Sequence, residues 1–407
     1  MAHHSPIGAP LIAETGGLNV MIVDSTALPE QAIKDIITSS FQSAGQRCSA
    51  LRVLYLQHDI AAEFMAMLFG AMDELVVADP WSLSTDIGPV INDMAKTKIT
   101  SHIAIAKKEN RLLKQLRSPK KGSFVGPAVI EIDTINDISE EIFGPVLHVA
   151  KFDPSELDQI VEDINSSGYG LTFGLHTRID DRAQKITANL NMGNMYVNRN
   201  QIGAIVGSQP FGGEGLSGTG PKAGGPNYLQ KFITEKKYKN TKSDQCRPLK
   251  KEIIQSALNN LTPKIHRKLG SELMKGPTGE SNLLSYFSIG TILCLGPTID
   301  KAMLQAKIVK DNGCEPLIIV PGAKSSSALS GFVKRDDLSS LYGFDAVVAW
   351  SDEEDQRAIK IALANRVGPI IPLITQLNFS QCCRLERHLC IDTTAAGGNA
   401  ALLASAS

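Results

Sequence analysis

Residues 18–56 read LNVMIVDSTALPEQAIKDIITSSFQSAGQRCSALRVLYL. The apolar run Leu18–Val23 predicts a strand, and Ala50–Leu56 predicts a second one. Between them, Pro29–Phe41 has apolar residues spaced to form one face, which indicates a helix. A strand, a helix and another strand joined by short connections are typical of an α/β domain.

The alternation of strands and helices continues to about Thr241, which predicts a first domain over residues 1–241. Further elements are expected at Ile60–Leu75 (a helix with Asp59 as its N-cap), Ser155–Ser166 (a helix) and Met195–Asn198 (a strand).

A polar, lysine-rich stretch follows the first domain. Residues 242–284 show no clear strand, and we interpret them as a connector that carries one or two helices, for example Lys250–Asn259. The alternation then resumes, with a strand at Thr291–Leu295, a helix at Thr298–Asp311 and a strand at Pro316–Pro321. This βαβ unit predicts a second parallel sheet in a C-terminal, Rossmann-like α/β domain over residues 285–407.

The composition fits a globular protein of 407 residues, with 43% hydrophobic and 20% charged residues. A net charge of -1 offers no broad basic surface for nucleic acid, and no apolar run is long enough to form a transmembrane segment. The seven cysteines include no CxxC pair, which argues against a disulfide framework or a zinc ribbon. We therefore expect a cytoplasmic location, peripheral to the membrane if the chain belongs to a larger protein.

One cysteine stands apart from the others because of its surroundings. Cys48 follows the helix breaker Ala44-Gly45 and precedes a predicted strand, so its thiol can lie exposed at the end of a sheet. Arg47 beside it would favour the thiolate, which is the reactive form. The alternative is a small core residue in a tight connection, and the local sequence does not decide between the two.

An acidic residue in an unusual place forms the second candidate. Glu14 lies between an apolar run and Gly16-Gly17, in the string Leu11-Ile-Ala-Glu-Thr-Gly-Gly17. A semi-buried carboxylate there would tend toward a raised pKa and would suit general-base chemistry, and the glycines would let the backbone approach a ligand closely. An ordinary acid at a loop tip is the other interpretation.

Four motifs in order resemble the aldehyde dehydrogenase superfamily. They are Glu14-Thr-Gly-Gly17, Gly45-Gln-Arg-Cys48 with the cysteine 34 residues after the acid, Glu140-Glu-Ile-Phe-Gly-Pro145, and Gln209-Pro-Phe-Gly-Gly-Glu-Gly-Leu-Ser-Gly218. The likeness implies an aldehyde dehydrogenase catalytic domain joined to the C-terminal α/β domain.

Two stretches narrow the resemblance to L-glutamate γ-semialdehyde (1-pyrroline-5-carboxylate) dehydrogenases. They are Gln46-Arg-Cys-Ser-Ala-Leu-Arg52 and Gly203-Ala-Ile-Val-Gly-Ser-Gln-Pro-Phe-Gly-Gly213. The version in the bifunctional proline utilization A flavoenzymes is the most similar, because that family can also carry an extra C-terminal α/β domain. Its terminal motif resembles Asp392-Thr-Thr-Ala-Ala-Gly-Gly-Asn-Ala-Ala401 here.

The resemblance implies a thiol-based oxidation with NAD as the cofactor. Cys48 would attack the aldehyde, its own backbone N–H would be one oxyanion donor, and Glu14 would activate the water that hydrolyses the thioester. Glu141 would bind the nicotinamide ribose and Phe143 would pack beside it. Without that role they would be a solvated acid and a core aromatic residue.

The substrate of this family is a small aldehyde that also has a carboxylate. Arg47 and Ser49 flank the cysteine and could bind that carboxylate. The backbone N–H groups of Gly203 and Ala204 resemble the family's substrate-anchor loop, and Phe211 would stack on the aliphatic stem. The alternative for this loop is a turn that binds no ligand.

Two other patterns are set aside. Gly213-Glu-Gly-Leu-Ser-Gly218 fits the dinucleotide fingerprint, but Gly220-Pro221 follows it where a helix should start, so we interpret it as a loop. His388 and Cys390 share a face of a predicted strand, and we expect core packing and no metal site there.

The chain begins 13 residues before Glu14, whereas the cofactor half of the family precedes that motif. We therefore expect the chain to be the C-terminal portion of a larger dehydrogenase, joined to or complemented by an N-terminal half. FAD would bind only in an absent proline dehydrogenase module. A homo-oligomer is expected through a strand in Tyr228–Tyr238. The alternative is a truncated, catalytically incompetent fragment that acts as a folded remnant or interaction module.

Overall fold

The structure, a computed structural model, describes residues 5–6, 9–233, 248–261, 266–323 and 328–394. The chain forms two compact units, each built from separate stretches of sequence. The first unit consists of Glu14–Ser217, Leu273–Leu284 and His388–Ser407, and the second of Met1–Ala13, Gly218–Glu272 and Ser285–Arg387. The division of the sequence at residues 241 and 284 stays a prediction.

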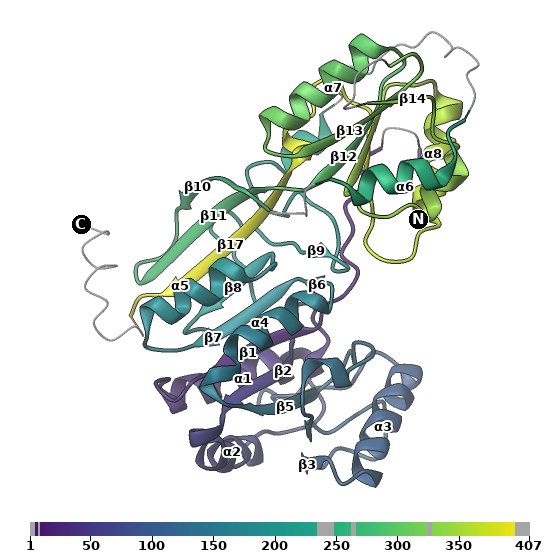
Figure 1. Cartoon of the computed structure of the whole chain (residues 1–407). Coiled ribbons are helices and arrows are strands. Elements are labelled where there is room, and N and C mark those ends of the chain that lie inside the picture. Colours follow the sequence, from purple (N-terminus) through teal and green to yellow (C-terminus); the bar gives the residue numbers. More distant parts are fainter. Residues whose placement is uncertain (1–4, 7–8, 234–247, 262–265, 324–327, 395–407) are drawn as a thin grey trace. The chain divides into compact units, whose positions relative to one another are not determined.

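A large mixed sheet organises the first unit (Figure 1). Its strand order is β10-β11-β17-β8-β7-β1-β2-β5-β4-β3. Neighbouring strands from β17 to β4 are parallel, whereas β3 and β4 are antiparallel. The strands are β1 Asn19–Val23, β2 Leu51–Gln57, β3 Leu112–Gln115, β4 Ala128–Glu131, β5 Val146–Phe152, β7 Thr172–His176, β8 Asn194–Val197, β10 Lys268–Met274, β11 Glu280–Ser288 and β17 Arg384–Asp392.

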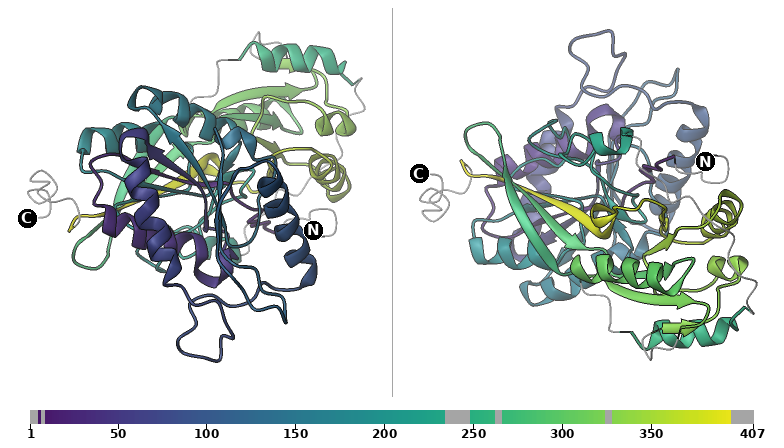
Figure 2. Two further views of the ribbon diagram at one scale, coloured as in Figure 1. Left: turned by 90° about the horizontal axis from the view of Figure 1, so that it is seen from below. Right: turned by 90° about the horizontal axis from the view of Figure 1, so that it is seen from above.

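Helices cover both faces of this sheet (Figure 2). The helices of the first unit are α1 Pro29–Phe41, α2 His58–Asp73, α3 Asp93–Lys108, α4 Leu157–Ser166 and α5 Asp180–Asn189. Short 3-10 turns lie at η1 Gln42–Gly45, η2 Ile135–Asp137 and η3 Pro154–Glu156, and a small antiparallel pair joins β6 Tyr169–Gly170 to β9 Glu214–Gly215.

The central strand β1 shows why the apolar run near the N-terminus fixes this arrangement. Its Met21 and Val23 pack with α1 and α2, whereas Val20 and Ile22 pack with α4 and α5 on the opposite face. All four side chains are fully buried. Burial of one such side chain contributes about 1.5–3 kcal/mol, so this strand is a main source of stability.

The second unit contains a parallel five-stranded sheet with the order β14-β13-β12-β15-β16. The strands are β12 Thr291–Leu295, β13 Glu315–Val320, β14 Ala328–Ser330, β15 Ala346–Ala349 and β16 Leu373–Ile374. The helices are α6 Lys251–Asn259, α7 Ile299–Asp311 and α8 Glu353–Ala364, with 3-10 turns at η4 Leu229–Phe232, η5 Arg335–Ser339 and η6 Ser380–Cys383. The predicted second parallel sheet is confirmed.

Two local predictions are wrong, and a third is tested only in part. Helix α2 begins at His58 with Gln57 as its N-cap, and Asp59 lies in the first turn, where its charge still favours the helix dipole. Strand β10 and the first part of β11 lie in the stretch for which no strand was expected. Strand β10 was missed because it is largely exposed and lacks an apolar pattern. The described part of Tyr228–Tyr238 contains the 3-10 turn η4 in place of a strand, and residues 234–238 lie outside the described part.

Candidate active site

The turn that carries Cys48 is set by a left-handed segment after helix α1. Ser43 and Ala44 have φ values of 56° and 53°, and Gly45 has a φ of 65°. A Cβ atom on Gly45 would lie 2.2 Å from the carbonyl oxygen of Gly144, so only glycine fits there. The helix therefore ends where the sequence predicted, and the chain reaches β2 through a tight turn around Cys48.

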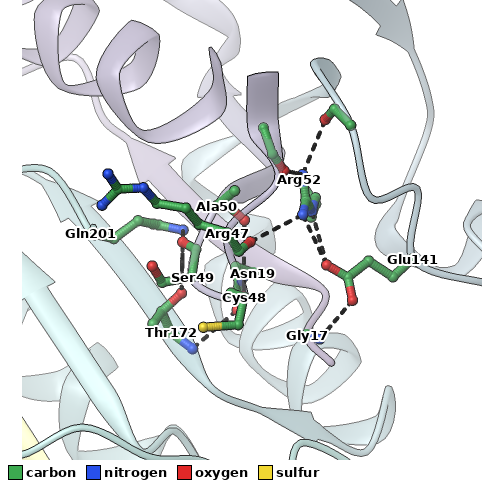
Figure 3. A network of polar contacts seen from close by, with 12 residues as sticks. Gly17, Asn19, Arg47, Cys48, Ser49, Ala50, Arg52, Glu141, Thr172 and Gln201 are labelled. Atoms are coloured by element: carbon green, nitrogen blue, oxygen red, sulfur yellow. Dashed lines mark hydrogen bonds and ion pairs between the residues drawn. The ribbon is translucent and has the colours of Figure 1, made fainter. Parts of the chain in front are cut away.

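Three successive carbonyl groups of this turn accept hydrogen bonds from buried side chains (Figure 3). The Arg47 carbonyl accepts from Arg52 Nη2 at 3.2 Å, and the Cys48 carbonyl accepts from Asn19 Nδ2 at 2.7 Å. The Ser49 carbonyl accepts from Thr172 Oγ1 and from Gln201 Nε2, each at 3.3 Å.

These bonds turn the peptide carbonyls into the protein and fix the backbone on both sides of the thiol. Asn19 Nδ2 also donates to the Ala50 carbonyl at 2.8 Å, and Asn19 Oδ1 accepts from Thr172 N–H at 3.1 Å. The Cys48 sulfur takes no part in the contacts drawn in Figure 3. A rigid turn with a sulfur outside its bonding network can present that atom to a reactant.

The pKa of the Cys48 thiol is raised above its ordinary value. Burial is the main cause, and the Glu14 carboxylate is the next, whereas the backbone N–H groups of Ser49 and Cys48 act in the opposite direction. The surroundings of Cys48 together therefore disfavour the thiolate, and a favourable effect of Arg47 stays a prediction. The Arg47 side chain donates from Nε to Ser43 Oγ at 3.2 Å.

The influence of Glu14 on this pKa means that the acid and the thiol, 34 residues apart in sequence, share one electrostatic environment. Glu14 is exposed, so the expected semi-buried position is wrong. Next to it, Thr15 N–H donates to the Ser217 carbonyl at 3.1 Å, and Thr15 Oγ1 donates to the Leu216 carbonyl at 2.5 Å. These bonds fix the backbone beside the acid.

Gly16 and Gly17, which follow Glu14, let another group lie close to the backbone. From the sequence, that group was expected to be a ligand. Here the group that approaches is the carboxylate of Glu141. Gly17 N–H donates to Glu141 Oε2 at 3.1 Å, and a Cβ atom on Gly16, which has a φ of 127°, would lie 2.9 Å from that oxygen. A side chain at Gly16 would therefore displace Glu141.

Glu141 is also paired with a buried arginine. Arg52 donates to Glu141 Oε1 from Nη2 at 2.9 Å and from Nε at 3.1 Å, and the Arg52 guanidinium lies 5.2 Å from the centre of the Phe143 ring. Arg52 Nη1 donates further to the carbonyls of Gly45 and Gly144. Arg52 thus links the Cys48 turn, Glu141 and Phe143.

The remaining predicted residues lie in the same unit. Ser49 is buried, and Phe211 is partly exposed. Asn194 fixes the backbone on both sides of Phe211, because its Nδ2 donates to the Pro210 carbonyl at 2.8 Å and its Oδ1 accepts from Gly212 N–H at 3.2 Å. A clamped backbone holds the ring of Phe211 in a defined place.

Gly203 and Ala204 lie near the tip of a loop, residues 199–209, that we call the anchor loop. Gly203 is exposed, with a φ of 76° and open space where a Cβ would lie. Among the described residues, no hydrogen bond found uses the backbone N–H of Gly203 or of Ala204. Two such donors on an exposed loop can bind an anion.

Three side chains that hold this site together were missed from the sequence: Arg52, Asn19 and Gln201. Each is polar, and each is at most 1% exposed. The sequence did indicate a bonding role for two of them. Arg52 and Asn19 interrupt apolar strands, and a polar side chain that is buried there must find hydrogen-bond partners. Gln201 lies in a loop, and nothing in its neighbourhood pointed to burial.

The loop expected at Gly213–Gly218 and the burial expected for His388 and Cys390 are both confirmed. The stretch from Gly213 to Gly218 contains the short strand β9 and no helix, so it is a loop. His388 and Cys390 lie on β17 and are fully buried. Within the described ranges, no group of three or more His, Cys, Asp or Glu side chains is placed to hold a metal ion.

No described helix combines the length and apolar content that crossing a membrane requires.

The aldehyde dehydrogenase family model matches residues 2–238. The bifunctional protein PutA of Klebsiella aerogenes is 40% identical over 435 residues, a match that covers 95% of this chain and 33% of that protein. This chain therefore spans about a third of the length of that curated relative.

Solved structures agree with this similarity. A bifunctional proline utilization A (PutA) protein is 52% identical, with a TM-score of 0.55 over 57% of this chain and 23% of that one. A 1-pyrroline-5-carboxylate dehydrogenase from Thermus with bound NAD is 34% identical, with a TM-score of 0.51 over 54% of this chain and 43% of that one.

Proposed function

Because this chain belongs to the aldehyde dehydrogenase family, we propose that it supplies the thiol and the base of an L-glutamate γ-semialdehyde dehydrogenase that acts in proline catabolism. The names of its relatives, PutA and 1-pyrroline-5-carboxylate dehydrogenase, support this substrate. Since the chain spans about a third of the PutA relative, we assign the complete activity to a longer protein or to a complex with a complementing N-terminal half.

The first half of the reaction takes place on Cys48. Its thiolate adds to the aldehyde carbon and forms a thiohemiacetal, and the Cys48 backbone N–H donates to the developing oxyanion. The carbonyl contacts around Cys48 fix the backbone that carries this N–H and the cysteine side chain. Oxidation to a thioester on the sulfur would transfer a hydride from the carbon to NAD, when it is bound, and would release the hydroxyl proton.

Glu14 acts in the second half. Its carboxylate takes a proton from a water molecule, and the resulting hydroxide attacks the thioester carbon. The carbon–sulfur bond breaks, which releases the carboxylic acid and restores the thiol. The exposed position of Glu14 lets water reach it, and its effect on the Cys48 pKa supports a place beside the sulfur.

Glu141 and Phe143 fit the nicotinamide end of NAD, which would accept the hydride when it is bound. A carboxylate offers about four lone-pair positions, and three are used here by Arg52 and Gly17, so Glu141 can still accept from a ribose hydroxyl. The Phe143 ring is 44% exposed and can pack against a flat group. We assign the rest of the dinucleotide site to the complementing half.

The anchor loop gives the substrate its orientation in this proposal. The N–H groups of Gly203 and Ala204 bind the substrate carboxylate, and Phe211 packs on the aliphatic stem. Arg47 and Ser49 are the nearest neighbours of Cys48 in sequence and contribute to the same end of the substrate.

The observation that carries the proposal is the fixed Cys48 turn in the electrostatic reach of Glu14. An acyl ester tests it without NAD. We expect p-nitrophenyl acetate to acetylate Cys48 and Glu14→Gln to accumulate the acetylated protein, as seen by mass spectrometry. Glu63→Gln, an exposed acid on α2, is the matched control and should behave as the parent. Acetylation that persists in Cys48→Ala would overturn the proposal.

A second experiment addresses the oxidation itself. The isolated chain with NAD and γ-glutamic semialdehyde should form no NADH, and addition of a polypeptide that covers the preceding portion of a PutA relative should restore turnover. Turnover by the isolated chain would contradict the need for a complementing half. If neither ester chemistry nor complementation occurs, the chain is an incompetent fragment.

A further inference from the structure

The anchor loop has a buried base and an exposed tip. Gln201 and Gln209, near its two ends, are at most 1% exposed, whereas Val206 at the tip is 83% exposed. Gly203 and Gly207 within the loop both have positive φ values. A loop of this composition has many accessible conformations unless its ends are fixed.

Both ends of the loop are bound to one carboxylate, that of Glu280. Arg199 Nη1 forms an ion pair with Glu280 Oε1, and Gln209 Nε2 donates to Glu280 Oε2 at 3.1 Å. Both donors also reach the Cys390 sulfur, Arg199 Nη1 at 3.2 Å and Gln209 Nε2 at 3.5 Å. The side chains of the ion pair are only 14% and 18% exposed, so solvent screens it little.

Glu280 is itself held in place by its own segment. It is the first residue of β11, its N–H donates to the Pro277 carbonyl at 3.2 Å, and its Oε2 accepts from Asn282 Nδ2 at 3.3 Å. Thr393 N–H, which follows β17, donates to the Gly279 carbonyl at 2.8 Å. The acceptor of the loop is therefore part of a structured strand end.

The origin of these groups is unexpected. The family match ends at residue 238, and both Glu280 and Cys390 lie beyond it, although they belong to the same compact unit as the anchor loop. The chain thus adds a carboxylate from outside the family-matched region to a loop inside it. Nothing in the acetyl-transfer or oxidation chemistry above requires Glu280.

We propose that Glu280 is a positioning residue that holds the two ends of the anchor loop together, so that the Gly203 and Ala204 N–H groups are preorganised to bind the substrate carboxylate. This inference rests on the proposed function for the identity of the bound group. Preorganisation lowers the conformational cost of binding, so Glu280 acts on substrate and product affinity and leaves the reactivity of Cys48 unchanged.

The test uses the full chain and L-glutamate, the carboxylate product, as the probe. Iodoacetamide alkylates Cys48, and the concentration of L-glutamate that halves the rate reports binding. We expect Glu280→Gln to raise that concentration by about fivefold to tenfold, with the rate in the absence of L-glutamate unchanged. Glu280→Asp, which keeps the charge on a shorter stem, should give an intermediate value. Glu272→Gln on β10, whose carboxylate pairs with Tyr286, is the matched control and should match the parent.

Hydrogen exchange provides a readout that does not depend on any ligand. Glu280→Gln should speed exchange of the amides from Gly203 to Gln209 while β8 keeps its protection. If Glu280→Gln fails to fold, Gln209→Leu removes the hydrogen bond from Gln209 to Glu280 and leaves the ion pair with Arg199. It should change amide exchange and protection by L-glutamate in the same direction as Glu280→Gln, but to a smaller extent. If L-glutamate does not protect the parent chain, the proposed substrate is wrong, and exchange alone decides the role of Glu280. Unchanged exchange and unchanged protection in both variants would overturn the inference.

Discussion

The guanidinium of Arg52 holds the carboxylate of Glu141 with two hydrogen bonds to one oxygen, from Nη2 at 2.9 Å and from Nε at 3.1 Å. The remaining nitrogen of the guanidinium, Nη1, bonds the carbonyls of Gly45 and Gly144, and Nη2 also reaches the Arg47 carbonyl. Arg52 is 1% exposed. One buried cation therefore joins the turn that carries the thiol to the acid that we assign to the cofactor.

Replacement of Arg52 tests this connection. Arg52→Met keeps much of the side-chain volume but removes the donors to Glu141 Oε1 and the hydrogen bonds from Arg52 to the carbonyls of Gly45, Arg47 and Gly144. Loss of one partner of a buried ion pair costs about 3–5 kcal/mol, so we expect a decrease of that size in the free energy of unfolding. Urea denaturation measures it.

The control for Arg52 is an exposed pair in the same unit. Lys185 and Asp158 are 62% and 77% exposed, and Lys185→Met should change the free energy of unfolding by less than about 1 kcal/mol. Equal effects of the two substitutions would mean that the Arg52 network contributes no more than a surface pair.

Asn19 offers a second test through an isosteric change. Asn19→Asp replaces an amide that donates to the Cys48 and Ala50 carbonyls by an oxygen that faces them. Since two buried carbonyls lose their donor, we expect a loss of about 2–4 kcal/mol in the free energy of unfolding. Asn189→Asp on the exposed end of α5, where the amide donates to the Lys185 carbonyl, should cost less than about 1 kcal/mol. Thermal unfolding of both variants compares them.

The fold was largely predictable because apolar residues recur at the spacing of a strand or a helix wherever these elements are buried. Helix α1 occurs at Pro29–Phe41 as predicted, and β1, β2, β12 and β13 fall within a residue or two of the expected ranges. Strand β10 was not predictable, because five or more exposed residues in succession carry no strand signal. Pairing with β11, the next strand along the chain, makes it a strand, although its own residues show no preference for one.

The candidate site was predictable only in part. Motif order pointed to Cys48, Glu14 and Glu141, but it could not show that Glu141 is engaged by Arg52 and by Gly17, which are remote in sequence. The raised pKa of the thiol was not predicted from Arg47, because adjacency in sequence says little about the burial of the thiol or about charges that are remote in sequence. Burial and the charge of Glu14 raise that pKa.

A pair of histidines behind Arg52 makes stability depend on pH. His148 Nδ1 donates to the Arg52 carbonyl at 3.0 Å, which leaves its Nε2 to accept from His102 Nε2 at 2.9 Å. Burial, and then His102, lower the pKa of His148 from 6.5 to about 3. Between those two values the unfolded chain binds a proton that the folded chain does not, so the free energy of unfolding falls as the pH falls from 6.5 toward 3.

His148 alone changes the free energy of unfolding by at most about 1.4 kcal/mol per pH unit. His148→Asn keeps a donor for the Arg52 carbonyl and removes the titration, so it should flatten the dependence over this window. The dependence should not vanish, because burial also lowers the pKa of His176 to about 4, whereas burial raises the pKa of Asp35 to about 6 and acts in the opposite sense. His58→Asn, at an exposed site, should leave the curve unchanged. An equal slope in His148→Asn and the parent would show that His148 has the same pKa in the folded and the unfolded chain, which would contradict the lowered pKa.

The raised pKa of Cys48 lets an experiment distinguish two roles of Glu14, because the two roles predict opposite changes in the rate of alkylation. Burial and the Glu14 carboxylate both disfavour the thiolate, so the rate of alkylation by iodoacetamide should still be rising with pH above pH 9. Glu14→Gln removes one of these causes, lowers the pKa of the thiol and should increase the alkylation rate at pH 7.5 by about two- to threefold. Glu63→Gln should not change it. If Glu14 instead served as the base that deprotonates the resting thiol, the same substitution would slow alkylation. A slower rate would therefore mean that Glu14 acts in the formation of the thiolate and not in the hydrolysis of the thioester.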